Sequence, residues 1–134
     1  MLIIKKHLEW GETDPAQIVF YPNYFRWFDA AGHELFSYLG VPLKNLKETE
    51  NIILPILNVT AKFIKPLKYD DNFEIRPYIS KINEKTIEIT YDVYKDDILY
   101  ATGTEIRGWV KLIGTKLKLI NIEEKFIRIF NKNN

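Results

Sequence analysis

Residues 24–39 read YFRWFDAAGHELFSYL, and this stretch decides the fold. Its apolar residues recur with the i, i+4, i+7 spacing of one helix face, at Tyr24, Phe28, Ala31, Leu35 and Leu39. Three more aromatic residues make that face wider than the stripe of an ordinary surface helix: Phe25, Trp27 and Phe36. The spacing therefore predicts one long helix that the rest of the chain encloses.

The expected helix has clear ends. Pro22 and Asn23 mark its start, and Asn23 is the candidate N-cap. Gly40, followed by Pro42, is a strong stop signal. Gly32 costs about 1 kcal/mol relative to alanine inside a helix, so we expect another backbone segment to approach closely there.

The hydrophobic period changes from 3.6 to 2 after residue 51. Alternation and turn residues predict strands over 2–10, 52–64, 73–82, 86–95, 98–113 and 116–122, and a short amphipathic helix over 123–130. Pro77 indicates a sheet edge or a bulge. Gly103 and Gly108 are expected bend or bulge points.

This order of elements predicts an α+β fold with one long central helix, wrapped by a curved antiparallel sheet of five to six strands. One face of the sheet would cover the helix, and the other would meet solvent or a partner. The length of 134 residues favours a single domain over 1–134.

Composition excludes several classes of function. Nineteen Lys and Arg against 18 Asp and Glu leave a net charge of +1, which argues against a nucleic-acid binder. With no cysteine, two serines and two histidines, the chain has no thiolate nucleophile and no Ser turn of the G-x-S-x-G kind. His7 and His33 have no shared spacing with carboxylates that would make a metal site, and His33 is expected to pair with Asp29 on the helix surface. We therefore expect no metal, and we also expect no cofactor. No run resembles a signal peptide or a membrane span, and we expect a cytoplasmic protein without membrane contact.

The stretch before the helix carries the candidate chemistry. Asp14 lies in a Thr-Asp-Pro turn, and the helix begins about eight residues later. Free N–H groups at a helix N-terminus can polarise a carbonyl oxygen and stabilise an oxyanion. A carboxylate at the same end can act as base or nucleophile, which suits acyl transfer. Glu12 is a second candidate acid, and Asp14 serving only as a turn residue is the simpler alternative.

The stretch E-W-G-E-T-D-P-A-Q-I-V-F-Y-P-N-Y over residues 9–24 resembles the opening signature of the 4-hydroxybenzoyl-CoA thioesterase family of hotdog-fold proteins. The family pattern is similar to G-x-x-D-P-A-G-I-V-(aromatic)-Y-P-N-Y followed by an aromatic helix. This chain has Gln17 where the family has glycine. Pro22 favours this branch over the related thioesterases of the Tol-Pal cluster, which have histidine there.

The resemblance implies a hotdog fold and hydrolysis of an acyl-CoA thioester with an aromatic or a short to medium acyl group. Asp14 would be the catalytic carboxylate, and the backbone N–H of Tyr21 would polarise the thioester carbonyl. The substrate would lie near Gln17, Pro22, Asn23, Tyr24 and Trp27. The resemblance also implies a homo-oligomer, a dimer or a tetramer, with sites at the subunit interface.

The phosphates of coenzyme A need positive charge, and Lys62, Lys65 and Lys68 are the nearest cluster in the sequence. An ordinary solvated face is the simpler interpretation of these lysines. Two other functions stay open: an acyl-CoA-binding domain without activity, which Gln17 suggests, and a thioesterase that acts on acyl-carrier protein.

Overall fold

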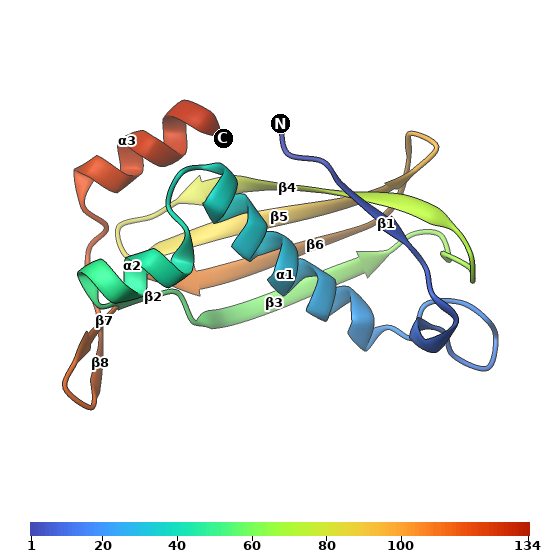
Figure 1. Cartoon of the computed structure of the whole chain (residues 1–134), viewed down its shortest axis with the longest axis horizontal. Helices are drawn as coiled ribbons and strands as arrows, with labels where there is room; N and C mark the ends of the chain where they lie inside the picture. The colour runs from blue at the N-terminus through green and yellow to red at the C-terminus, as the bar shows by residue number, and fades with distance from the viewer.

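The computed structural model describes the backbone of residues 1–134 and every side chain except that of Asn133. Five strands form one antiparallel sheet in the order β1-β4-β5-β6-β3 (Figure 1). Their bounds are β1 Ile4–His7, β3 Ile56–Phe63, β4 Asn72–Ile82, β5 Thr86–Lys95 and β6 Ile98–Gly108. A small second sheet, β2-β7-β8, joins β2 Ile52–Ile53, β7 Val110–Ile113 and β8 Lys116–Leu119.

Helix α1 (Pro22–Tyr38) lies across one face of the five-stranded sheet (Figure 1). Its buried residues include the predicted aromatic positions Tyr24, Trp27, Phe28 and Phe36. The Phe28 ring stacks on the Tyr91 ring of β5, with centroids 5.0 Å apart and an interplanar angle of 15°. Two short helices, α2 (Leu43–Glu50) and α3 (Glu124–Asn133), and the 3-10 turn η1 (Trp10–Glu12) complete the chain.

Most of the predicted elements are confirmed, some with different bounds. β5 covers the predicted range 86–95, and α3 covers the predicted amphipathic helix. The expected strand 52–64 is interrupted between β2 and β3, and 98–113 is interrupted at Trp109 between β6 and β7. Pro77 lies beyond the end of β1, where β4 is the sheet edge, so its missing N–H breaks no pairing there.

Three predictions about single residues in the elements are wrong. Asn23 is not the N-cap but lies inside α1, after Tyr21 at the N-cap position and Pro22 at the first helical position. Gly32 makes room for the Tyr91 hydroxyl rather than for another backbone. Gly103 is not a bend within β6, because it provides the space that the Phe28 ring occupies.

A buried polar network joins α1 to the sheet. Tyr91 Oη donates to Glu105 Oε1, and Arg107 Nε donates to the same oxygen at 3.0 Å. Arg107 Nη2 reaches Asp29 Oδ1 of α1 at 2.9 Å. Burial and the adjoining Glu105 carboxylate raise the pKa of Tyr91, so this phenol stays protonated. Because both charges of the Arg107–Glu105 pair have partners, their burial does not leave an unpaired ion in the core.

Among the described helices, none is long and apolar enough to cross a membrane.

Candidate active site

Asp14 is held by the hydrogen bonds of its own loop. Its backbone N–H donates to Ile18 O at 2.9 Å, and its Oδ1 accepts from the Ala16 N–H at 2.8 Å. A bridge between Thr13 and Val19 closes the base of this loop. The residue is half-buried, and the hydrogen bond from Ala16 fixes one of its carboxylate oxygens.

Glu12 ties this loop to α1. Its Oε2 accepts from Trp27 Nε1 at 3.0 Å, and its Oε1 accepts from the Glu9 N–H at 2.9 Å. Its backbone carbonyl accepts from Asn23 Nδ2 at 2.9 Å. The carboxylate of Glu12, the second candidate acid of the sequence, therefore has both oxygens engaged in holding the loop. Sequence reasoning missed this role because it depends on contacts 11 and 15 residues away.

The start of α1 includes a free amide. Within the part of the chain that the structure describes, the Tyr21 N–H has no acceptor, and Pro22 has no N–H to offer. The next two amides are used, because Asn23 N–H donates to Phe20 O at 3.0 Å and Tyr24 N–H donates to Tyr21 O at 3.1 Å. The Tyr21 N–H lies at the positive end of the helix dipole and is available to an incoming oxygen.

Asp14, Tyr21 and Tyr24 line one groove of about 520 Å³ between α1 and the segment after β3. Its remaining wall is mostly apolar and comprises Ile18, Val19, Phe20, Phe63, Ile64, Lys65, Pro66 and Leu67. Burial raises the pKa of Tyr24 to about 12, so its phenol is a neutral hydrogen-bond donor at physiological pH. The groove combines a carboxylate, a free amide and an apolar wall.

The other predicted substrate-binding residues lie outside the lining of this groove. Asn23 and Trp27 are buried beneath the loop, where they hold Glu12. Gln17 is exposed, with a φ of 63°, and its carbonyl accepts from the Tyr69 N–H at 2.9 Å. This left-handed conformation is one that glycine adopts without cost, which explains glycine at this point of the family pattern.

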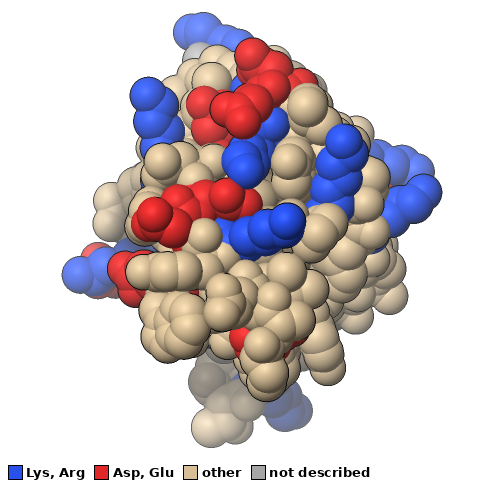
Figure 2. Space-filling model, turned by 90° about the vertical axis from the view of Figure 1, so that its right-hand side faces the viewer, with Lys and Arg blue, Asp and Glu red and all other residues tan. Residues whose placement is uncertain are grey.

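Of the three predicted phosphate-binding lysines, one lines the groove. Lys65 lines the groove, with its Nζ 5.9 Å from the centroid of the Tyr100 ring. Lys62 lies on the exposed edge strand β3, and Lys68 belongs to the turn before β4. Figure 2 shows basic and acidic side chains close to one another at this end of the molecule, with no continuous basic patch on the visible face. Among the described side chains, no group of three or more His, Cys, Asp or Glu is placed to hold a metal ion.

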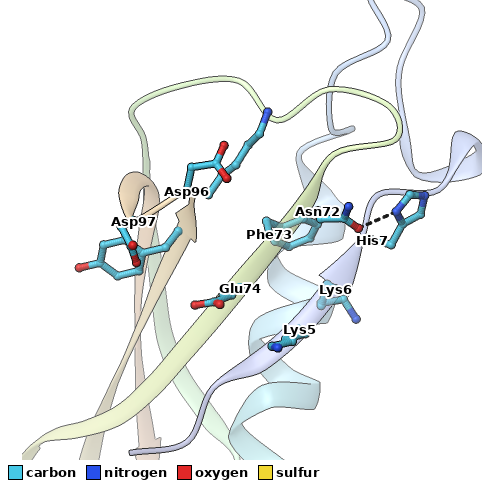
Figure 3. A pocket seen from close by; sticks show the side chains of 10 residues that line it. Lys5, Lys6, His7, Asn72, Phe73, Glu74, Asp96 and Asp97 are labelled. Atoms are coloured by element: carbon cyan, nitrogen blue, oxygen red, sulfur yellow. Dashed lines mark hydrogen bonds between the residues drawn. The ribbon is translucent and has the colours of Figure 1, made fainter.

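A second hollow of about 520 Å³ lies between β1, β4 and the β5–β6 turn (Figure 3). Its lining is polar and carries both signs of charge, with Lys5, Lys6, Glu74, Asp96 and Asp97 among its residues. His7 Nδ1 lies 2.9 Å from Asn72 Oδ1 at its rim. The hydrogen bond to Asn72 and the nearby Asp70 carboxylate raise the pKa of His7. Because its lining is more polar and charged, this hollow is a poorer place for an acyl group than the groove at Asp14.

The family model described as the Thioesterase-like superfamily matches residues 8–129, and the chain belongs to this family. The match includes the loop, α1 and four of the five strands of the large sheet, and β1 lies just before its first residue. The family thus accounts for the hotdog arrangement of antiparallel sheet and helix.

Two curated relatives show which chemistry occurs in the family. The chain is 30% identical over 135 residues to a 4-hydroxybenzoyl-CoA thioesterase of Pseudomonas sp. (strain CBS-3), and the match covers 96% of each chain. It is 29% identical over 138 residues to a 1,4-dihydroxy-2-naphthoyl-CoA hydrolase of Prochlorococcus marinus, covering 98% of this chain and 92% of the relative.

Solved structures agree with this assignment. An aspartate-to-asparagine mutant of 4-hydroxybenzoyl-CoA thioesterase, complexed with 4-hydroxybenzoyl-CoA, has a TM-score of 0.88 and 28% identity, covering 96% of this chain and 97% of that one. A gentisyl-coenzyme A thioesterase has a TM-score of 0.82 and 30% identity, covering 97% of this chain and 99% of that one.

Proposed function

We propose that this protein is an acyl-CoA thioesterase that hydrolyses the thioester to a free acid and coenzyme A. The observation that carries the proposal is that Asp14 and Tyr21, whose N–H has no acceptor among the described residues, line one groove with an apolar wall. The thioesterase relatives support it, because their similarity extends over nearly the whole chain.

In this mechanism the thioester carbonyl oxygen accepts a hydrogen bond from the Tyr21 N–H, which stabilises the negative charge that develops on it. Asp14 acts in one of two ways. As a general base, it takes a proton from water while the water oxygen bonds to the carbonyl carbon. As a nucleophile, its oxygen bonds to that carbon and displaces the thiolate, and water then hydrolyses the anhydride. Either way the C–S bond breaks and coenzyme A leaves.

Other residues of the site receive roles that follow from their positions. Tyr24 contacts the acyl group, while Asn23 and Trp27 hold the loop that carries Asp14. Gln17 is part of the loop that carries Asp14, and Pro22 sets the start of α1. Lys65 is the lysine best placed for a phosphate of coenzyme A, since it lines the groove. A cytoplasmic location stays a prediction.

The active form is a homo-oligomer that is built on the edge strand β3, with the groove at the interface. Support comes from the apolar side chains that this edge exposes, which are Ile56, Leu57, Val59, Phe63 and the adjoining Ile64. Pairing of two such edges continues the sheet and removes this apolar surface from water. In such an assembly, the curved sheet and the second subunit together wrap α1.

The test measures release of free coenzyme A thiol from a panel of aromatic and aliphatic acyl-CoAs. Asp14→Asn keeps the size of the side chain and is expected to lower kcat about 10²–10⁴-fold. Asp96→Asn is the matched control, because Asp96 is an exposed carboxylate of the β5–β6 turn outside this groove. The proposal fails if the wild-type protein hydrolyses none of the panel, or if both variants keep the full rate.

Two alternatives are distinguished in the same experiment. Tight binding of acyl-CoA without turnover would favour an inactive binding domain, for which the strained Gln17 is the structural argument. Faster turnover of the same acyl group on acyl-carrier protein than on coenzyme A would identify the carrier protein as the substrate.

A further inference from the structure

The half-buried Glu12 accepts a hydrogen bond on each of its carboxylate oxygens. Trp27 Nε1 donates to Oε2 at 3.0 Å, and the Glu9 N–H donates to Oε1 at 2.9 Å. An indole N–H and a backbone N–H can only donate, so both positions need an acceptor. A carboxylate has an acceptor at both positions, whereas a glutamine side chain has an oxygen at one and an NH2 donor at the other. The contacts of Glu12 therefore require a carboxylate and not merely a side chain of this size.

The backbone carbonyl of Glu12 closes the base of the loop that carries Asp14. It accepts from the Phe20 N–H at 2.9 Å and from Asn23 Nδ2 at 2.9 Å. Phe20 immediately precedes Tyr21, whose N–H we assign to the thioester carbonyl. Glu12 is thus two residues from Asp14 in the chain and is hydrogen-bonded to the neighbour of Tyr21.

Trp27 gives the Glu12 carboxylate a fixed partner. Trp27 is only 4% exposed, and its ring packs against the rings of Phe73 and Tyr24, with centroids 5.1 and 5.3 Å away. A side chain packed in the core has little room to follow a moving loop. The hydrogen bond between Trp27 and Glu12 therefore ties the loop to the core of the molecule.

We propose that Glu12 is a positioning residue of the reaction, whose carboxylate fixes the Asp14 carboxylate relative to the Tyr21 N–H. The proposal rests on the proposed function and adds a residue that does not line the groove. Both oxygens of Glu12 already accept hydrogen bonds, so Glu12 holds the loop and Asp14 remains the group that acts on the substrate. A misplacement of about 1 Å in a reacting group can lower a rate about 100-fold.

The first experiment measures kcat and KM for the best substrate of the acyl-CoA panel in the wild-type protein, Glu12→Gln and the control Glu34→Gln. Glu34 is exposed on α1 outside the groove, so the control makes the same chemical change away from the site. We expect Glu12→Gln to lower kcat about 10- to 100-fold and to change KM less than about threefold, because Asp14 moves while the wall of the groove remains. Glu34→Gln should leave both constants unchanged. An unchanged kcat in Glu12→Gln, or a loss confined to KM, would overturn the proposal.

A second variant tests whether the effect of Glu12 passes through Trp27. Trp27→Phe removes the indole donor, and thermal unfolding verifies that the variants fold. Because either substitution breaks the same contact, kcat in Glu12→Gln/Trp27→Phe should exceed the value expected from multiplying the two single losses by at least about fivefold. Single losses that multiply without this excess would reject the tether.

Hydrogen exchange separates this proposal from the proposed function, because it needs no turnover. The Asp14 N–H donates to Ile18 O and the Phe20 N–H donates to Glu12 O, so both amides report on the closed loop. We expect both to exchange at least about tenfold faster in Glu12→Gln than in the wild-type protein and Glu34→Gln.

The combined outcomes are distinct. Faster exchange in a protein that hydrolyses no acyl-CoA supports the tether and rejects only the proposed function. Turnover that Glu12→Gln leaves unchanged keeps the thioesterase and rejects the positioning role. Unchanged exchange of both amides rejects the tether whether or not the protein is a thioesterase.

Discussion

Tyr21 immediately precedes α1 with a φ of −54° and a ψ of −31°. A proline ring imposes a φ close to this value, so proline can replace Tyr21 without a large change in the backbone. The replacement removes the amide hydrogen that we assign to the thioester carbonyl. It also removes the phenol side chain, which replacement by alanine removes as well. Tyr21 therefore offers a direct way to delete a backbone hydrogen-bond donor.

We expect Tyr21→Pro to lower kcat about 10²–10³-fold, the usual loss for one oxyanion donor. Tyr21→Ala keeps the amide and serves as the control, with an expected loss below about tenfold. Thiol release under saturating acyl-CoA measures both, and thermal unfolding verifies that both variants fold. Similar activities of the two variants would contradict a role for this amide.

Gln17 replaces the glycine of the family pattern, and the loop accommodates it. Its φ of 63° places it in the left-handed region, which costs a residue with a side chain about 1 kcal/mol or more. Its side chain is exposed and does not line the groove. The substitution therefore adds strain to the loop without filling the space beside Asp14.

At the scale of elements, the position of α1 on the sheet depends on two contacts that need glycine. Phe28 of α1 occupies the space above Gly103 of β6, and the Tyr91 hydroxyl occupies the space beside Gly32. A methyl group at either glycine would overlap these side chains. The free Tyr21 amide lies at the start of α1. The packing of α1 on the sheet therefore also fixes the position of this amide in the candidate active site.

We expect Gly103→Ala to lower the free energy of unfolding by about 1–3 kcal/mol, since the Phe28 ring must move to admit the methyl group. Gly11→Ala is the matched control, because nothing lies within 4 Å of a Cβ added at Gly11. Chemical denaturation measures both. An unchanged stability of Gly103→Ala would show that Phe28 is not packed as the structure describes.

Strands and helices with a strong hydrophobic period were predictable from the sequence. The short helix α2 and the interruption between β6 and β7 were not. The range of β5 follows from its strict alternation of Ile87, Ile89, Tyr91 and Val93 with polar residues. Helix α2 was not predicted, because its eight residues have only two leucines and a single buried position, Leu46. Trp109, which follows the end of β6, is buried and contacts Phe126 of α3, a partner distant in sequence.

At the scale of the whole molecule, β3 is the edge strand of the five-stranded sheet, and seven of its eight residues are exposed. Its central residue Val59 is 41% exposed. An apolar edge of this length is a site where a second copy can pair. The oligomer proposed above therefore depends on this strand.

We expect Val59→Lys to convert the oligomer to a monomer of 15.9 kDa, because the charge is unfavourable to bury in a paired edge. Light scattering coupled to size exclusion measures the mass. Ile98→Lys is the control, since Ile98 is 46% exposed at the β5–β6 turn, away from β3. An unchanged mass of Val59→Lys would exclude β3 as the interface, and loss of activity together with the oligomer is expected if the groove is shared.

The sequence by itself determined the order of the elements, the family and the candidate chemistry of Asp14 and Tyr21, because periodicity and the loop signature are local in the chain. Only the tertiary structure decided which residues share the groove. Phe63 and Lys65 join Asp14 there, while Asn23 and Trp27 instead bind Glu12 beneath the loop. The physical reason is that these contacts join segments up to about 50 residues apart, and the pairing of such segments is set by packing rather than by local spacing.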